Sequence, residues 1–201
     1  MPEEDDSISG SLIAAAIERL ARLMRAGEYA EGLNPAQWEA LRYLSRANRF
    51  SNSPGALTRY LGATKGTISQ TLMALERKGF VGKAVRQGEK RSVALTLTVK
   101  GEAALSRDPW ARLAADAEGL GGKTRRRLAK GLRQLLGNEL DRGHHHSFGL
   151  CATCRFHRAN GRESDPHGPH FCLLLELPLS ADDSRRICIE HEAASTRRPS
   201  T

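Results

Sequence analysis

The segment LTRYLGATKGTISQTLMALERKGFV, residues 57–81, decides the fold of this 201-residue chain. It contains a short helix-forming stretch, a turn at Gly62 and a second, amphipathic helix-forming stretch that Thr64 can cap. The apolar residues of the second stretch recur at i, i+4 and i+7, and they are Ile68, Leu72 and Leu75. This spacing places them on one face of a helix. Two helices joined by a tight turn predict a helix-turn-helix.

The residues that follow change from helical to strand periodicity. Gly79 closes the second helix, and VGKAVRQGEKRSVALTL, residues 81–97, has β-branched residues on both sides of a polar tip that contains glycine. This pattern predicts a two-stranded hairpin, with Lys90 and Arg91 near its tip. A helix-turn-helix followed by a basic hairpin predicts a winged helix-turn-helix.

The face of the second helix opposite its apolar stripe predicts contacts with a DNA major groove. Gly66 lets the backbone come close to DNA, and Thr67 and Gln70 can contact base edges, with Gln70 the strongest candidate. Lys65 and Arg77 can lie against phosphates, and the hairpin tip can enter the minor groove. The predicted DNA-binding residues are Lys65, Gly66, Thr67, Ser69, Gln70, Arg77, Lys90 and Arg91. The alternative is an ordinary solvated helix face, and the conjunction of both helices with a basic hairpin favours DNA.

Positive charge is concentrated in the same part of the chain. Residues 56–100 hold nine Lys or Arg against Glu76 and Glu89, which gives this segment a net charge of +7. The net charge of the whole chain is +8. Residues 1–10 carry four acids and no bases. A basic segment of this kind indicates a polyanionic partner, although many basic segments are only solvated surface.

Apolar periodicity and end signals predict the rest of the fold. The short first helix of the helix-turn-helix is expected over about 54–62, and further helices at about 8–26, 35–47, 98–118 and 123–141. From Gly143 on, the composition changes to Gly, Pro, His, Arg and Ser without helical periodicity. We therefore expect a mainly α winged-helix domain with a small β wing over residues 1–142. A small irregular Cys/His-rich module over 143–195 and a disordered tail over 196–201 complete the predicted organisation.

Residues 57–81, together with KRSVALTLTVKG at 90–101, resemble the MarR family of bacterial transcriptional regulators. The resemblance covers roughly residues 8–142. It implies a helical dimer with one winged-helix domain per subunit, whose first and last helices, here 8–26 and 123–141, form the dimer interface. In the family an acid usually precedes the wing arginine by two positions. The wing arginine therefore corresponds to Arg91, and Glu89 replaces the more frequent Asp.

The terminal helices give an independent reason to expect a homodimer. Both have long apolar faces that one small domain would leave partly uncovered. Two-fold symmetry would place two recognition helices about one DNA turn apart on an inverted repeat. The alternative is that the two helices pack on each other within a monomer. The resemblance also implies a small aromatic or anionic effector, for which Trp38, Tyr43 and Trp110 are candidate contacts, although each is more simply explained as core.

The four cysteines all lie in the C-terminal segment and predict a metal site. Cys151 and Cys154 form a C-x-x-C pair. Seventeen residues lie between Cys154 and Cys172, and fifteen lie between Cys172 and Cys188. Four thiolates suit zinc, or alternatively an iron–sulfur cluster, and the spacing does not separate the two. Free thiols or a reversible disulfide are a third alternative. A metal is favoured because residues 143–195 have too few large apolar groups to fold on their own core.

Several histidines could replace a cysteine ligand. They are His157, His170 and His191, each two or three residues from a cysteine. His144, His145 and His146 are expected to form a polar spacer, and His167 is expected at the surface.

Other functional classes find little support. No stretch is apolar enough to cross a bilayer and the first residues are acidic, so we expect no membrane association and a cytoplasmic protein. No G-x-S-x-G, H-E-x-x-H or glycine-rich phosphate loop occurs, so we expect no enzyme. The competing hypothesis is a small metalloprotein or thiol-disulfide redox protein, which the absence of a βαβ context around the C-x-x-C pair disfavours.

Overall fold

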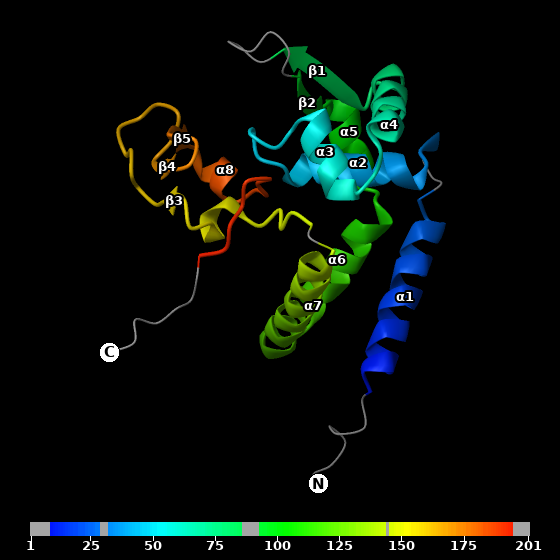
Figure 1. Cartoon of the computed structure of the whole chain (residues 1–201). Coiled ribbons are helices and arrows are strands. Elements are labelled where there is room, and N and C mark those ends of the chain that lie inside the picture. The colour runs from blue at the N-terminus through cyan, green and yellow to red at the C-terminus, as the bar shows by residue number, and fades with distance from the viewer. Residues whose placement is uncertain (1–8, 29–31, 86–92, 144, 195–201) are drawn as a thin grey trace, which may run out of the picture.

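The computed structural model describes residues 9–28, 32–85, 93–143 and 145–194 (Figure 1). Its helices are α1 (Gly10–Ala26), α2 (Pro35–Arg46), α3 (Pro54–Leu61), α4 (Lys65–Arg77), α5 (Val99–Leu105), α6 (Pro109–Gly119), α7 (Gly122–Arg142) and α8 (Ala181–Ser184), with a 3₁₀ turn, η2, at Cys151–Thr153. The strands are β1 (Val81–Val85), β2 (Val93–Leu97), β3 (His157–Arg158), β4 (His170–Cys172) and β5 (Leu177–Leu179). Within these parts, no helix is long and apolar enough to cross a membrane.

Local capping explains why the helices of the winged helix begin and end where they do. Asn34 and Gln37 form a reciprocal capping box at the start of α2. Thr64 caps α4, and its hydroxyl accepts a hydrogen bond from the backbone N–H of Thr67 at 3.1 Å. Gly62 ends α3 in the left-handed conformation, with φ +61°, which glycine adopts without steric cost. The predicted helix-turn-helix is therefore confirmed.

The predicted hairpin is also confirmed. Strands β1 and β2 pair antiparallel, with Val81 opposite Leu97 and Val85 opposite Val93. Leu95 turns inward and is buried, so β2 joins the core of the domain. The hairpin tip, residues 86–92, lies outside the described residues, and with it the predicted contacts Lys90 and Arg91.

The single helix predicted over 98–118 is wrong, because the structure contains two helices in that range. α5 ends at Leu105, and α6 begins at Pro109 with Asp108 as its cap. Proline suits the first position of a helix, where its missing N–H costs nothing, but it disrupts a helix interior. The apolar periodicity continues across the break, which explains the error.

One apolar core holds α2 to α5 and the hairpin together. Trp38, Leu41, Tyr43, Leu57 and Leu75 are fully buried in it. Helices α1, α6 and α7 extend away from this core (Figure 1). The mainly helical winged-helix fold with a small antiparallel wing is thus as predicted.

Residues 145–194, which we call the cysteine module, pack against the winged helix. The module has a three-stranded antiparallel sheet in the order β3-β4-β5, followed by α8. Its Phe148 is buried in the winged-helix core, and Ile187 and Ile189 pack against that core. The division of the chain at residue 142 remains a prediction.

The module contacts residues 47–52, the connection between α2 and α3, which we call the docking segment. The N–H of Ile187 donates to the carbonyl of Arg46 at 2.8 Å, and the N–H of Asn48 donates to the carbonyl of Ile187 at 3.0 Å. Ala47 and Ile187 thereby form a parallel β-bridge. The N–H of Ile189 donates to the Ser51 hydroxyl at 2.8 Å. Backbone pairing therefore fixes the module to the winged helix.

Candidate nucleic-acid interface and cysteine cluster

Helix α4 buries the predicted apolar stripe and exposes the predicted DNA face. Ile68, Leu72 and Leu75 are at most 2% exposed. All six predicted contacts that lie on α4 are exposed: Lys65, Gly66, Thr67, Ser69, Gln70 and Arg77. Met73, on the same face as Gln70, is 49% exposed. The arrangement leaves a polar helix face free for a duplex, while the role of each residue remains a prediction.

The exposed residues of α4 differ in what surrounds them. A Cβ at Gly66 would meet only the Thr64 hydroxyl, at 3.8 Å, so the fold itself does not require glycine there. The hydroxyl of Thr67 lies 2.9 Å from that of Thr64 and is part of the cap. Ser69 lines a groove of about 400 Å³ between α3, α4 and the hairpin. Gln70 is therefore better placed than Thr67 or Ser69 to contact a base edge.

The basic residues near α4 divide into two groups. The Lys78 ammonium donates to the carbonyl of Gly32 and to Gln37, Lys83 pairs with Glu76 at 2.7 Å, and Lys100 donates to the carbonyl of Lys78. These lysines stabilise the fold. Within the part of the chain that the structure describes, the side chains of Lys65 and Arg77 make no hydrogen bond or ion pair, so both are free to meet phosphates.

A buried ionic network ties α1, α2 and α6 together. Arg42 of α2 pairs with Glu28, just after α1, at 2.6 Å and with Asp108, the cap of α6, at 3.2 Å. The Trp110 indole N–H donates to Glu28 at 3.0 Å, and Glu28 is only 1% exposed. The members of this network are distant in sequence, so no local pattern predicts it. The Asp108–Pro109 pair was the available signal for the cap.

Of the three aromatic residues considered for an effector site, two belong to the interior and Trp110 is half-buried. Trp38 and Tyr43 are fully buried, and Trp110 belongs to the network just described. The interpretation as core is therefore confirmed for Trp38 and Tyr43.

The cysteine module gathers its thiols around a small apolar cluster. Cys151 and Cys188 are buried beside Leu179, and Cys172 and Phe50 pack against them. Cys154 follows one turn after Cys151 and is half-buried. Phe50 belongs to the docking segment, so the thiols adjoin the winged helix directly.

Burial and mutual proximity suppress ionisation of the central thiols. Burial, together with the nearby Cys188, Cys172 and Cys154 thiols, raises the pKa of Cys151 to about 12. A reactive redox cysteine needs a lowered pKa, so the environment of Cys151 disfavours a free-thiol redox role.

Hydrogen-bond donors nevertheless face these sulfurs. Burial raises the pKa of Cys188, but Asn48, the backbone N–H of Glu190 and Ser51 oppose that rise by hydrogen bonding to its ionised form. The buried Nδ2 of Asn48 makes no hydrogen bond within the described residues. The N–H of Glu192 donates to Cys154 Sγ at 3.5 Å. Donors of this kind favour thiolate sulfur, as in metal and iron–sulfur sites.

The histidines of the module have other partners. Both ring nitrogens of His191 lie 3.0 Å from hydroxyls, those of Ser147 and Thr153. His157 Nε2 lies 3.0 Å from the Ser184 hydroxyl, and His170 Nδ1 accepts the N–H of Asn160 at 3.2 Å. Burial lowers the pKa of both His157 and His191. His167 is exposed, as expected, and His145 and His146 are exposed; His144 lies outside the described residues.

The described thiols do not converge on a single point. Across the parts of the chain that the structure describes, no three His, Cys, Asp or Glu side chains are grouped so that they could hold one metal ion. Tetrahedral zinc requires sulfurs about 3.8 Å apart, given a Zn–S bond of about 2.3 Å. In an iron–sulfur cluster several irons share the thiolates, so the sulfurs stand further apart. The two cofactors therefore place different demands on the same four cysteines.

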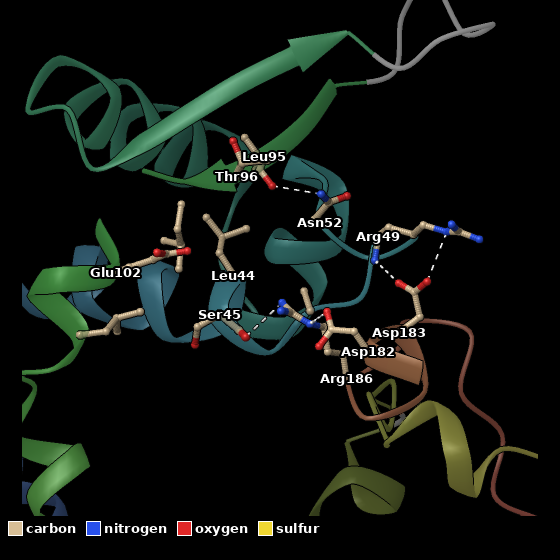
Figure 2. A pocket seen from close by; sticks show the side chains of 13 residues that line it. Leu44, Ser45, Arg49, Asn52, Leu95, Thr96, Glu102, Asp182, Asp183 and Arg186 are labelled. Carbon is tan, nitrogen blue, oxygen red and sulfur yellow. Dashed lines mark hydrogen bonds and ion pairs between the residues drawn. The ribbon is translucent and has the colours of Figure 1, made fainter. Parts of the chain in front are cut away.

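A pocket of about 440 Å³ separates the module from the wing (Figure 2). On one side Asn52 of the docking segment donates from Nδ2 to the carbonyl of Leu95 in β2 at 3.0 Å. On the other side Arg49 pairs with Asp183 of α8 at 3.5 Å and also donates to the carbonyl of Pro178. The docking segment thus contacts both the wing and the module.

Comparison with known proteins finds a family that is similar to part of the winged helix. Residues 31–92 match the MarR family model. None of the curated proteins compared with the chain matches it. The match supports a DNA-binding transcriptional regulator, because that is the role the family resemblance implies.

Solved structures similar to this chain include a MarR transcriptional regulator from Methanosarcina mazei Go1, with 24% identity, a TM-score of 0.50, and coverage of 65% of this chain and 98% of that one. FabT of Streptococcus pneumoniae in complex with DNA has 20% identity and a TM-score of 0.49, covering 65% and 94%. A MarR family protein of Mycobacterium tuberculosis in complex with salicylic acid has 28% identity and a TM-score of 0.46, covering 65% and 98%. The first of these shows the shared fold, and about a third of this chain lies outside each match.

Proposed function

We propose that this protein is a transcriptional regulator that binds an inverted DNA repeat as a homodimer. The observation that carries the proposal is the face of α4, where Gln70, Lys65 and Arg77 are exposed within residues 31–92, which match the MarR family model. Gln70 would contact base edges in the major groove, where its amide can make two hydrogen bonds to adenine. Lys65 and Arg77 would neutralise phosphates, and Lys90 and Arg91 of the wing would enter the minor groove.

Unpartnered apolar faces support the homodimer. Five side chains of α1 are between 41% and 60% exposed: Leu12, Ile13, Ile17, Leu20 and Leu23. Four of α7 are between 44% and 58% exposed: Leu128, Leu132, Leu135 and Leu136. Contiguous apolar surface on this scale usually marks an interface, and closed two-fold symmetry buries it on both copies. Changing Leu132 to Glu should convert the dimer to monomer in analytical ultracentrifugation, whereas Lys130→Glu on the same helix should not.

The test of DNA binding begins with selection of duplexes from a random pool by the full-length protein. We expect an inverted repeat whose half-sites are about one helical turn apart. Gln70→Ala should relax the sequence preference at one position of each half-site, and Arg77→Ala should weaken binding to all sequences. Arg185→Ala removes an exposed charge far from α4 and serves as the control. Failure to enrich any sequence would contradict the proposal.

We further propose that Cys151, Cys154, Cys172 and Cys188 bind a thiophilic metal centre, zinc in the first place and an iron–sulfur cluster as the alternative. The packing of Cys151, Cys172 and Cys188 in one apolar cluster and the N–H of Glu192 that donates to Cys154 support this site. Elemental analysis and a visible spectrum of anaerobically purified protein separate the cases. Zinc gives colourless protein and a cluster gives brown protein with iron and sulfide. Protein without metal that also fails to take up Zn²⁺ or iron with sulfide would exclude the centre.

A small-molecule effector is a further part of the proposal. An apolar pocket of about 340 Å³ lies between α3 and α7, where Tyr60, Leu136 and Leu140 line it beside Arg59. A small aromatic acid would place its ring against the apolar side chains and its carboxylate toward the guanidinium. Calorimetric titration with benzoate tests this pocket, and Arg59→Ala should weaken binding if the carboxylate meets Arg59.

A further inference from the structure

We infer that Phe148 is a positioning residue for DNA recognition, because it fixes the C-terminal end of α7 to the helix-turn-helix and thereby makes binding selective for one spacing of the half-sites. This inference rests on the proposed homodimer and its inverted repeat, and it adds what holds their spacing. Three observations carry it: the place of the Phe148 ring, the backbone that holds this ring, and the sparse packing of α7 on the winged helix.

The Phe148 ring lies inside the winged helix, although the residue follows α7 in the chain. It is 7% exposed and belongs to the apolar core of the winged helix. Its centroid lies 5.1 Å from that of Tyr60 in α3 and 6.0 Å from that of Tyr43 in α2, in both cases edge to face. This arrangement is favourable for aromatic pairs. Phe148 therefore contacts the first helix of the helix-turn-helix directly.

The module holds the backbone on both sides of Phe148. The Ser147 hydroxyl donates to the carbonyl of His191 at 2.9 Å, and the carbonyl of Gly149 accepts the N–H of Cys188 at 3.0 Å. Phe148 itself has φ +44°, a left-handed conformation that is costly for a bulky side chain. Such a conformation persists only where the surrounding structure over-determines it. The ring is therefore held in one place by its neighbours in the chain as well as by the core.

Helix α7 has little other packing on the winged helix. None of its residues is buried, and among the described residues the apolar core includes none from α6 or α7. A pocket of about 340 Å³ separates α7 from α3. After α7 the chain turns back, where the N–H of His145 donates to the carbonyl of Leu140 at 2.9 Å, and it reaches Phe148 three residues later. Residues 145–148, which we call the anchor segment, therefore tie the C-terminal end of α7 to the core.

The anchor segment is the second of two attachments between the winged helix and the pair of helices α6 and α7. The first is the ionic network at the start of α6, where Asp108 pairs with Arg42 at 3.2 Å. A body attached at one point can pivot about it, whereas a second, separate attachment removes most of that freedom. In the proposed homodimer α7 is part of the dimer interface, so the angle between α7 and the winged helix sets the distance between the two copies of α4. Phe148 thus restricts that distance.

The expected effect is selectivity for half-site spacing. One additional base pair between the half-sites moves them about 3.4 Å further apart and turns one by about 34° relative to the other. The wild type should therefore bind the selected duplex at least about tenfold more tightly than duplexes with one base pair more or fewer, a loss within the range of a single mismatched base pair. Without the anchor segment the winged helix can adopt several angles to α7, so this spacing ratio should fall at least about threefold.

The experiment measures binding of the full-length protein to these three duplexes by fluorescence anisotropy. The first variant carries four Gly or Ser residues inserted after Gly143, which leave Phe148 and its contacts in place but uncouple them from α7. The second variant, Phe148→Ala, removes the ring. Both should lower the spacing ratio, whereas Phe148→Leu, which keeps an apolar side chain in the core, should retain most of it.

Phe171→Ala is the matched control, because it removes the same atoms from a half-buried position in the module and should keep the wild-type ratio. An unchanged ratio in the insertion variant would overturn the inference even if Phe148→Ala fails to fold. A loss in Phe171→Ala as large as in Phe148→Ala would assign the effect to the module as a whole and would overturn the role of Phe148. If no duplex is selected, the regulator proposal fails instead, and if the protein is monomeric, the homodimer proposal fails.

Discussion

The winged helix and the cysteine module are built on different physical principles. The winged helix closes around large buried side chains such as Trp38, Leu57 and Leu72, so its free energy of folding comes mainly from removing apolar surface from water. The module buries few apolar groups and uses backbone pairing to the docking segment, ionic contacts and clustered thiols. The comparison teaches that the module depends on the winged helix for most of its packing, while the winged helix takes Phe148 of the module into its own core.

The largest effect should come from a cavity in the winged helix. Leu72→Ala should lower the free energy of unfolding by about 2–5 kcal/mol, because it removes a buried side chain that is 1% exposed. Urea denaturation of the whole chain measures this loss. Met73→Ala, on the exposed face of the same helix, should cost less than about 1 kcal/mol. Equal losses in the two variants would contradict the assigned orientation of α4.

The second effect should be confined to the module. Removing the proposed metal with chelator, or changing Cys151 to Ser, should reduce hydrogen-exchange protection of residues 150–190 by at least about tenfold and leave α2 to α5 protected. Ala152→Ser is the control, because it changes an exposed neighbour in the same way. Unchanged exchange in residues 150–190 after complete metal removal would show that the module is held by its interface alone.

A smaller effect should follow from weakening that interface. Arg49→Ala should cost about 1 kcal/mol, because its ion pair with Asp183 is partly exposed and screened by solvent, although it also loses the bond to the Pro178 carbonyl. Limited proteolysis should show faster cleavage within the module than within the winged helix. Arg185→Ala, an exposed arginine of the module, should leave the cleavage rate unchanged.

The smallest effect should appear only in DNA binding. Lys65→Ala should leave stability unchanged and lower the slope of log affinity against log salt by about 0.9, the value for one phosphate contact. Lys78→Ala should instead reduce stability, because the Lys78 ammonium donates to the Gly32 carbonyl and to Gln37 and so ties α4 to the start of α2. If Lys78→Ala changed the salt slope more than Lys65→Ala does, Lys78 and not Lys65 would be the lysine that contacts phosphate.

Local features of the winged helix could be predicted from the sequence because they depend on neighbouring residues. The stripe of Ile68, Leu72 and Leu75, the cap at Thr64 and the turn at Gly62 each follow from spacing and side-chain chemistry within one or two turns. The break at Asp108 was missed because apolar periodicity continued across it and outweighed the signal of Pro109.

The candidate sites could be predicted only in part, because they depend on residues that are distant in sequence. Exposure of Gln70 and Arg77 follows from the helical wheel, but the bonds of Lys78, Lys83 and Lys100 within the protein depend on partners elsewhere in the fold. The placement of Asn48 beside Cys188 joins residues 140 positions apart, and no periodicity reports such a contact. The cysteine spacing indicated a shared site but not that the winged helix would supply its donors.

The ionic network of Glu28, Arg42, Asp108 and Trp110 joins α1 to the core, and this joint affects the spacing of the DNA half-sites that the proposed homodimer would bind. Gly27 adjoins it so closely that a Cβ there would lie 2.7 Å from Pro109 Cγ, so α1 leaves the core at a fixed angle. The 17 residues of α1 make a lever roughly 25 Å long. Tilting it by about 10° would carry its far end roughly 4 Å, slightly more than one base-pair step of about 3.4 Å. In the proposed homodimer, substitutions at this joint would therefore retune half-site spacing without altering any residue that touches DNA.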